Sequence, residues 1–534
     1  MFQLCWSGGC SCGVRDIVEM ELLKLLNPAQ MDASARLQCL VGTRQEVLSF
    51  ITGWLTTPLE GQNVLWLYGL AGSGKSTIST TVAEYFRDLG RLGAFIFFDR
   101  NNSANSDPNA VIRTLAHWLA SFDSHIRSAI CAAIEGDKNI SSAPIQRQFA
   151  KLVLDPLESI ATVPMQGPVV IILDGLDECG DPTSRRSLMR LLADEFNKLP
   201  AMFRFLITSR EESDINASLA IQPNIIKHEL NITEDSNIND VSMFLHKEMG
   251  TIRNRHGLAY DWPGEVKICD MVNHSAGLFI WASLAVNLIT EAYDPNKQLD
   301  ALLHTGSRGT AEAVLDTLYA TALHAAGKWE DDHFIADFQS ILGMVLAGRI
   351  LLSDSIINHI LDPDRHILSK VMLSRLQCLL IWKPGHPVQV LHASFADYLT
   401  NPNRSGKEPW YIDMCVAHHT LAIGCLRLMK AGLHFNICGL KTSYLSNKAV
   451  SGLSQQIEKA IPPHLVYACQ FWADHLHPAL GSEILKSYLQ DFIYNNLLYW
   501  FEALSLLGSV ALASPALLKT AQWSRVSGIL LYCC

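Results

Sequence analysis

The eight residues Gly69–Ser76 constrain this chain more than any other segment. They read Gly-Leu-Ala-Gly-Ser-Gly-Lys-Ser, follow the apolar run Val64–Tyr68 and precede a helical pattern over Thr77–Phe86. This order of strand, glycine-rich loop and helix is typical of a P-loop, because the glycines let backbone N–H groups curl around a polyphosphate. Lys75 would reach the terminal phosphate oxygens, and Ser76 could ligate Mg²⁺ at a helix N-terminus that favours anions. We therefore expect a nucleoside triphosphate site.

Four short apolar segments predict a parallel sheet around this loop. They are Val64–Tyr68, Gly93–Asp99, Val169–Leu173 and Phe203–Thr208, and amphipathic helical patterns lie between them. Continuous apolar runs belong to strands that are buried on both faces. The predicted fold class is therefore an α/β P-loop NTPase domain, a parallel sheet with helices on both faces, followed by helical, winged-helix and all-α domains.

The pattern becomes helical after about residue 230. Apolar spacing near 3.6 covers residues 237–249, 265–274, 278–293 and 311–326. Two further helices are then followed by a strand, a turn and a strand over residues 378–392, which is the order of a winged helix. The expected parts are a short leader over 1–38, a nucleotide-binding domain over 39–230, a helical domain over 231–330, a winged-helix domain over 331–402 and a helical region over 403–534.

A second acidic motif follows the third apolar run. Asp174 comes directly after Val169–Leu173, and Asp177 and Glu178 lie one short turn further on. An open α/β sheet binds its ligand at the carboxyl ends of the strands, so Asp174 is expected to hold Mg²⁺ through water. Of the later pair we favour Glu178 over Asp177 as the general base that polarises an attacking water. An ordinary solvated acidic turn is the alternative for Asp177.

Two arginines follow other predicted strands. Arg210 comes after Thr208 and Ser209, where it could sense or stabilise the charge of the terminal phosphate. An arginine that keeps a strand end solvated is the alternative. Arg100, after the second apolar run, has the same two interpretations and is a secondary candidate.

The sequence favours adenine over guanine as the base. A GTPase would carry an Asn-Lys-x-Asp element, and the nearest string, Asn296–Asp300, has one residue too many and lies in the helical region. The expected cofactors are therefore ATP or ADP and Mg²⁺.

Composition narrows the expected partners. The chain has 534 residues and a net charge of −10 without a basic stripe, so nucleic-acid binding is not expected. Its 14 cysteines lack zinc-site spacing and are interpreted as reduced thiols, which favours a cytoplasmic protein. The apolar stretch Leu497–Leu518 contains Glu502, Gly508 and Pro515, so a packed terminal helix is preferred to a membrane span.

Several strings together make the chain resemble the NACHT-type members of the STAND class of P-loop ATPases, over about residues 36–520. In particular, it is similar to fungal NACHT proteins whose N-terminal half resembles nephrocystin-3. The strings that carry the resemblance, besides the P-loop, are Cys39–Arg44, Asp174–Glu178, Thr208–Arg210, Gly277–Ala282 and His392–Phe395.

The resemblance implies an ATP- and ADP-controlled signalling switch that hydrolyses ATP slowly, oligomerises on activation and acts with unidentified protein partners. In fungi such proteins are often linked to self/non-self recognition, a form of innate immunity, and to regulated cell death. The resemblance also implies that His392 reaches the β-phosphate of ADP, whereas its neighbours alone favour a core histidine. The nucleotide contacts expected from the P-loop and the resemblance are Gly42, Arg44, Gly69, Ala71, Gly72, Ser73, Gly74, Lys75, Ser76, Thr77 and His392.

Two alternatives stay open at this point. The first is a truncated scaffold with a structural nucleotide. Most relatives continue into β-propeller or ankyrin repeats, and the lack of a repeat array in this sequence supports the scaffold, whereas the intact Lys75, Asp174 and Glu178 argue against it. A metabolic P-loop kinase or ATPase is the third hypothesis, and it lacks support because no set of nucleophile, base and orienting group is visible beyond the phosphate site.

Overall fold

The structure is a computed structural model that describes residues 10–31, 36–57, 61–100, 102–160, 167–304, 310–361, 368–442, 444–476, 478–479 and 481–526. The chain divides into two compact units, residues 1–315 and 316–534. Helix α14 (Ala311–Ala326) crosses the boundary between them.

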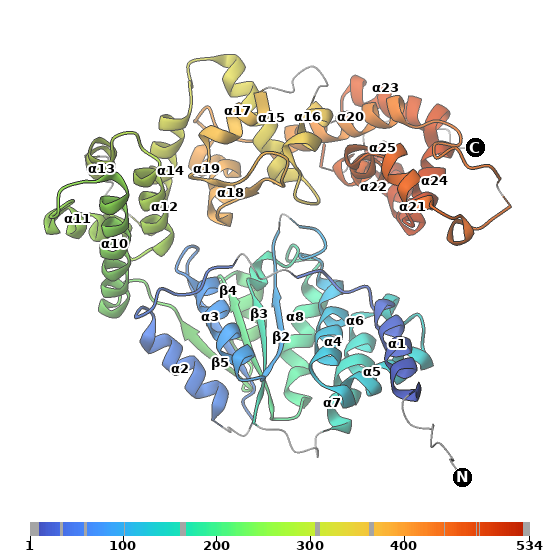
Figure 1. The fold of residues 1–534 in the computed structure, drawn as a ribbon, viewed down its shortest axis with the longest axis horizontal. Coiled ribbons are helices and arrows are strands. Elements are labelled where there is room, and N and C mark those ends of the chain that lie inside the picture. Colours follow the sequence, from blue (N-terminus) through green and yellow to red (C-terminus); the bar gives the residue numbers. More distant parts are fainter. Residues whose placement is uncertain are drawn as a thin grey trace, which may run out of the picture. The chain divides into compact units, whose positions relative to one another are not determined.

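The first unit is built around a five-stranded sheet in which all neighbouring strands are parallel (Figure 1). The strand order is β2-β3-β4-β1-β5. This sheet, covered by helices on both faces, confirms the predicted α/β fold class. The strands are β1 (Val64–Tyr68), β2 (Leu92–Phe97), β3 (Val169–Asp174), β4 (Phe203–Ser209) and β5 (Ile225–Glu229).

Strand β5 is not predicted by the sequence pattern. Its only apolar residues are Ile225 and Ile226, and the polar residues Lys227, His228 and Glu229 complete it. It lies at the edge of the sheet, and β1 is its single partner among the described strands. An edge position requires no continuous apolar run, which is why composition does not reveal this strand.

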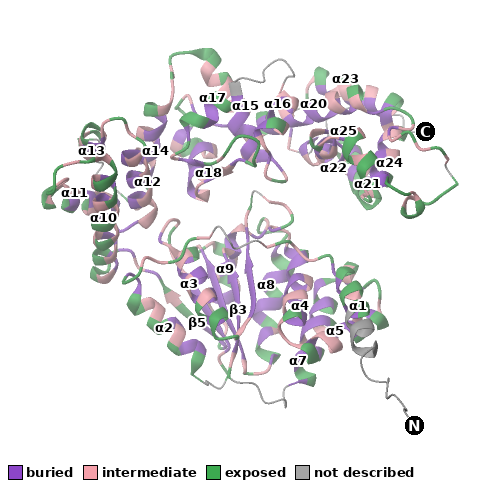
Figure 2. Ribbon diagram, in the orientation of Figure 1, coloured by how far each residue is buried: buried purple, intermediate pink, exposed green. Residues whose placement is uncertain are grey.

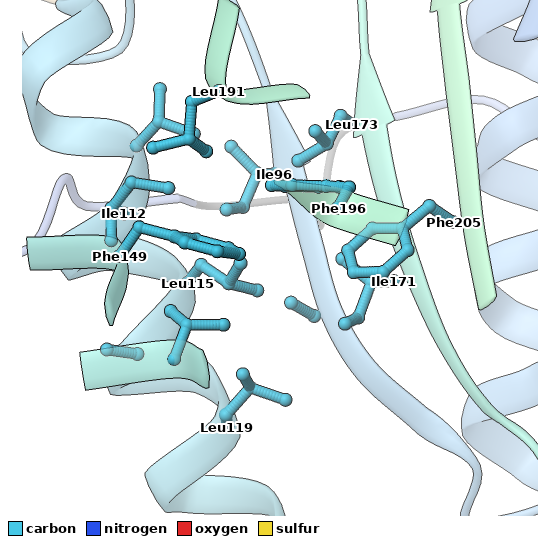
Figure 3. Packing of buried hydrophobic residues seen from close by; sticks show 14 of the residues in the cluster. Ile96, Ile112, Leu115, Leu119, Phe149, Ile171, Leu173, Leu191, Phe196 and Phe205 are labelled. Atoms are coloured by element: carbon cyan, nitrogen blue, oxygen red, sulfur yellow. The ribbon is translucent and has the colours of Figure 1, made fainter. Parts of the chain in front are cut away.

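Successive residues of the interior strand β3, which lies between β2 and β4, enter two different cores, as the two-residue period of a strand requires. Ile171 and Leu173 pack on one face with Phe149 and Phe196 (Figure 3). Ile172 packs on the other face with side chains of helices α2 and α3. Figure 2 shows the resulting band of buried residues along the sheet. The elements that cover the two faces or connect the strands are α1 (Cys10–Lys24), α2 (Gln45–Thr56), α3 (Lys75–Asp88), α4 (Val111–Phe122), α5 (Ser124–Gly136), α6 (Ile145–Phe149), η3 (Ala150–Leu154), α7 (Asp155–Ser159), α8 (Arg186–Asp194) and α9 (Ser213–Leu219).

A helical bundle completes the first unit. Its members are α10 (Asp235–His256), α11 (Glu265–Ser275), α12 (Phe279–Thr290) and α13 (Pro295–His304), and each packs against at least one other. All but α13 coincide with helical segments predicted from apolar spacing. Helix α12 begins after the left-handed residues Ala276 and Gly277, which turn the chain sharply between α11 and α12.

The second unit begins with helices and a small antiparallel ribbon. The predicted order of two helices, a strand, a turn and a strand is present as α16, α17, β6 and β7, although each strand is only two residues long. The predicted domain boundaries themselves stay a prediction. The elements of this part are α15 (Asp332–Ala347), α16 (Asp354–Leu361), α17 (Leu368–Arg375), β6 (Leu380–Ile381), β7 (Gln389–Val390), α18 (Ala393–Thr400) and α19 (Pro402–Ser405).

The remainder of the second unit is helical, and Trp410, Trp472 and Trp500 are buried in it. The single terminal helix expected over 497–518 is wrong, because the chain turns at Gly508, whose φ is +67°. Within the described ranges, no helix has both the length and the apolar character needed to cross a bilayer. The helices are α20 (Met414–Gly432), α21 (Leu453–Ala460), α22 (Pro463–Leu476), α23 (Glu483–Asp491), α24 (Leu497–Leu506) and α25 (Ala513–Val526).

Candidate functional site

The loop between β1 and α3 is shaped by glycines. Gly72 and Gly74 have φ values of +77° and +95°, in the left-handed region that glycine enters without strain. Among the described residues, the amide N–H groups of Gly74, Lys75 and Ser76 have no hydrogen-bond acceptor. Unpaired amides at the start of a helix are the groups that bind phosphate, so this loop fits a polyphosphate.

Lys75 is buried at the start of α3. Its ammonium Nζ donates hydrogen bonds to the carbonyl oxygens of Gly69 and Leu70, each at 2.8 Å. Burial lowers the pKa of Lys75 to about 8, and the nearby Asp177 carboxylate opposes that shift. The side chain is therefore held inside the loop, with acidic residues close enough to affect its charge.

Asp174 is a buried carboxylate whose two oxygens both bind side chains of this chain. Oδ1 accepts hydrogen bonds from Ser79 Oγ and Thr208 Oγ1, both at 2.6 Å. Oδ2 forms an ion pair with Arg36. Ser76, the other predicted Mg²⁺ ligand, lies one helical turn before Ser79 on α3, and no hydrogen bond joins it to Asp174 in the described structure. The two predicted ligands thus lie at the start of α3 and at the end of β3, and Ser79 is the residue of α3 that binds Asp174.

The carboxylate of Asp177 interacts with two arginines. Its Oδ1 accepts a hydrogen bond from the Arg210 amide at 3.0 Å, and its Oδ2 lies 3.1 Å from Arg210 Nε. Arg100 Nη2 is 4.0 Å from the same Oδ2. The structure therefore brings together Asp177, Arg210 and Arg100, which the sequence places on three separate segments.

Glu178 is half-buried beside this cluster, and its Oε2 accepts a long hydrogen bond of 3.4 Å from the Arg100 amide. Burial raises the pKa of Glu178 to about 7; Arg100 opposes the shift, and Asp177 and Asp99 add to it. A carboxylate with a pKa near neutrality is suited to general base catalysis. Asp177, by contrast, is occupied with its arginines.

Arg44 binds the backbone of the phosphate-binding loop. Its Nη2 donates to the Ser73 carbonyl oxygen at 2.5 Å, and its guanidinium carbon lies 4.6 Å from the centre of the Phe279 ring. The Arg44 amide donates to Asp240 Oδ2 at 2.9 Å, with the backbone in the left-handed region. In this structure Arg44 thus joins the loop to helices α10 and α12. The other expected contacts, Gly42, Ala71 and Thr77, lie in or beside the same loops.

The start of α12 rests directly on the phosphate-binding loop. The Ile280 amide donates to the Gly72 carbonyl oxygen at 3.2 Å. A Cβ atom on Gly72 would lie 2.0 Å from Ile280 Cγ2, so only glycine fits at this position. The string Gly277–Ala282 therefore places the helical bundle in contact with the loop.

Sequence reasoning missed two arginines of the site. Arg36 binds Asp174, and the buried Arg185 donates to both Asp214 oxygens, at 2.7 and 2.8 Å, and to the Asp177 carbonyl oxygen at 3.0 Å. Arg185 thereby joins the acidic motif to the segment after β4. Neither arginine belongs to a motif of fixed spacing, so no sequence signal marks it.

His392 belongs to the second unit. It precedes α18, and its Nδ1 accepts a hydrogen bond from the Ser394 amide at 3.1 Å and lies 2.6 Å from Ser394 Oγ. Ser394 Oγ also lies 2.7 Å from the Tyr319 hydroxyl. Within its own unit, His392 is thus a helix cap, and its expected contact with nucleotide stays a prediction.

Comparison with known proteins supports the class of this site. The sequence model of a family described as "Nephrocystin 3, N-terminal" matches residues 42–210, which is less than half of the chain. That span contains the glycine-rich loop, the acidic motif and Arg210. No curated protein matches the chain.

Two solved structures are similar to parts of the chain. CDC6P from Pyrobaculum aerophilum is 12% identical with a TM-score of 0.32, over 68% of this chain and 94% of that chain. A Drosophila ORC structure bound to DNA is 14% identical with a TM-score of 0.30, over 74% of this chain and 95% of that chain. At these TM-scores the likeness supports no conclusion about this chain.

The parallel sheet, the loop geometry and the family match define the class. The protein is a P-loop NTPase, with its phosphate-binding loop between β1 and α3. Its acidic motif lies at the carboxyl end of β3, as this class of fold requires.

Proposed function

We propose that this protein is an ATP/ADP-controlled switch of the NACHT type, with slow ATP hydrolysis and nucleotide-dependent oligomerisation. The observation that carries the proposal is the hydrogen bond from Ile280 at the start of α12 to Gly72 in the phosphate-binding loop. A change in the loop on exchange of ADP for ATP would act directly on the helical bundle. Such a switch requires that the two nucleotides favour two global states differently.

Each site residue has a role in this proposal. Lys75 and the loop amides hold the β- and γ-phosphates. Ser76 and Asp174 are the residues that would hold Mg²⁺, which neutralises phosphate charge when bound. Glu178 accepts the proton of the attacking water, and Arg210, positioned by Asp177, stabilises the charge that develops on the terminal phosphate.

Few side chains of the described residues could ligate Mg²⁺ at this site. Among the described residues, no group of three or more histidine, cysteine, aspartate or glutamate side chains could hold a metal ion. In a P-loop site, Mg²⁺ is held by one or two protein groups together with phosphate oxygens and waters. Ser76 and Asp174 offer a hydroxyl and a carboxylate oxygen, which are donors of the kind that Mg²⁺ binds.

The proposal extends to signalling on the strength of the NACHT resemblance. The partners would be further copies of this chain and other proteins, and in fungi the process would be non-self recognition or regulated cell death. The family match over residues 42–210 supports the P-loop class, and the extension to signalling rests on the resemblance alone.

The first experiment identifies the nucleotide that the purified protein carries. The protein is denatured, and the released nucleotide is separated by chromatography. Bound ADP supports a resting switch. Samples reloaded with ATP or ADP are then compared by sedimentation, and a larger species with ATP alone is expected. Identical sedimentation with both nucleotides contradicts the switch.

A scaffold with a structural nucleotide is the competing proposal. The observation that favours it is that both oxygens of Asp174 already bind side chains of this chain. In that case the bound nucleotide exchanges no faster in the presence of Mg²⁺ and ATP, and sedimentation does not change.

A further inference from the structure

Arg36 lies before every nucleotide-binding motif of the chain, yet its guanidinium is placed on Asp174. Several contacts hold it. Nη2 pairs with Asp174 Oδ2, Nε donates to Thr80 Oγ1 at 3.3 Å, and the guanidinium carbon lies 4.5 Å from the centre of the Phe97 ring. Cys39, three residues further on, is also held to α3, because its amide donates to Thr81 Oγ1 at 2.8 Å. This segment is thus attached to the same helix that begins in the phosphate-binding loop.

The contacts of Asp174 decide which oxygen a metal ion could use. Oδ1 already accepts two hydroxyl hydrogen bonds, from Ser79 and Thr208. Oδ2 is therefore the oxygen that remains for a cation, and Arg36 is on it. A guanidinium keeps its charge at every pH at which proteins are folded, so Arg36 leaves only by displacement.

A divalent ion and Arg36 would repel each other at this oxygen. Magnesium prefers carboxylate oxygen ligands, and a fixed positive charge on the same oxygen opposes its approach. Asp174 is 2% exposed, so solvent screens this repulsion little.

We propose that Arg36 is an internal counter-cation of Asp174 that the divalent ion must displace. The nucleotide-loaded site then binds the metal ion more weakly than the same site would without Arg36. The metal also weakens the attachment of residues 36–39 to α3, which ties the start of the domain to the metal-bound state. This inference rests on the proposed function, because it assumes that the site binds nucleotide with a divalent ion.

The test uses Mn²⁺ as the probe, since its paramagnetic resonance signal reports the free ion directly. The full chain is loaded with ADP in EDTA, desalted and titrated with Mn²⁺. Arg36→Gln is expected to lower the half-saturating Mn²⁺ concentration about tenfold, the change that follows from losing one competing charged hydrogen bond. The matched control is Arg87→Gln, which removes the same charge from α3 where Arg87 pairs with Glu84 at the surface.

Thr80→Val is a second, milder variant, which keeps the inference testable if Arg36→Gln fails to fold. It removes the hydrogen bond to Arg36 Nε and leaves Asp174 paired, so the half-saturating concentration should fall in the same direction by a smaller factor. Equal Mn²⁺ affinity in wild type, Arg36→Gln and Thr80→Val overturns the inference. A wild-type protein that retains no ADP, with or without Mn²⁺, overturns the proposed function instead, so the two failures are distinguishable.

Discussion

Arginines pair with two of the acidic residues of the site, Asp174 and Asp177. Arg36 lies on Asp174, while Arg210 and Arg100 lie on Asp177. The motif residues could be predicted because their spacing within one segment is fixed by the chemistry of phosphate binding. The Arg36 and Asp174 pair could not, since 138 positions separate the two residues and only the folded chain brings them together.

Lys75→Ala is expected to weaken ATP binding by about 2–3 kcal/mol or more, roughly a hundredfold, because a buried charged donor to phosphate is lost. Isothermal titration of the full chain with ATP measures this loss. Lys151→Ala, which breaks an exposed pair with Asp155, is the control and should bind ATP normally. Unchanged affinity of Lys75→Ala would remove the phosphate-binding assignment.

Glu178→Gln is expected to bind ATP and lose hydrolysis, because it removes the base and keeps the shape of the side chain. The base acts when deprotonated, and the pKa of Glu178 is raised to about 7. Single-turnover hydrolysis by wild type should therefore rise as pH increases through about 7 and then level off. A Glu178→Gln protein with the wild-type rate assigns the role to Asp177 or to solvent.

At the scale of elements, apolar continuity decides what sequence can predict. Strands β1, β3 and β4 coincide with predicted segments to within one residue, because strands buried on both faces require unbroken apolar runs. Strand β5 and the break between α24 and α25 escape prediction. The first depends on pairing with β1, and the second on the backbone turn at Gly508.

The contact of α12 with the phosphate-binding loop predicts a position-specific effect of adding a methyl group. Gly72→Ala should destabilise the first unit by about 1–3 kcal/mol more than Gly90→Ala, because overpacking adds to backbone strain. Both glycines have positive φ, but Gly90 has no atom within 4 Å of an added Cβ. Thermal melting measures the difference.

The double variant Gly72→Ala with Ile280→Ala supplies the check on that interpretation. Removing the Ile280 branches makes room for the new methyl group, so the double variant should recover part of the stability that Gly72→Ala loses. A double variant less stable than the sum of both single changes contradicts steric conflict as the cause.

In the second unit, a buried pair of histidines joins α20 to α22. His418 Nδ1 lies 2.9 Å from His475 Nδ1, and His475 Nε2 lies 2.8 Å from the Tyr467 hydroxyl. Burial lowers the pKa of His418 to about 4; Arg349 adds to the shift and Asp474 opposes it. Burial lowers the pKa of His475 well below its ordinary value, and His418 and Arg349 add to that shift. Both imidazoles are therefore neutral in the folded protein at neutral pH.

This pair predicts acid sensitivity. In the unfolded chain these histidines bind protons near pH 6.5, whereas in the folded protein they stay neutral at that pH. Their contribution to the free energy of unfolding is therefore complete above about pH 6.5 and falls as the pH drops toward 4. The loss for His418 alone is on the order of 3 kcal/mol. Hydrogen exchange of α20 and α22 should accelerate across this window more than that of β1 and β3. Equal acceleration everywhere contradicts the local origin.

At the scale of the whole molecule, the phosphate-binding loop, the acidic motif and the arginines all belong to the first unit. The small β6–β7 ribbon and the C-terminal helices belong to the second unit. A switch needs a free-energy difference between ADP and ATP states that both units share. That coupling can be measured as a difference between the affinities for ADP and ATP, with a variant that leaves the fold of both units intact.

His392 provides the test of this coupling. The NACHT resemblance assigns its position to the ADP state, so His392→Leu should weaken ADP binding more than ATP binding by about 1–3 kcal/mol, the usual size of an allosteric coupling, and favour a larger species in sedimentation. Because His392 also caps α18 through Ser394, the leucine variant could act through that helix alone. His392→Asn separates the two effects, since asparagine is a good N-cap residue but lacks the imidazole. If His392→Asn binds ADP as wild type does, or if His392→Leu weakens ADP and ATP equally, the histidine serves only its helix. Selective loss of ADP affinity in both variants, with normal thermal stability of His392→Asn, assigns it to the nucleotide state.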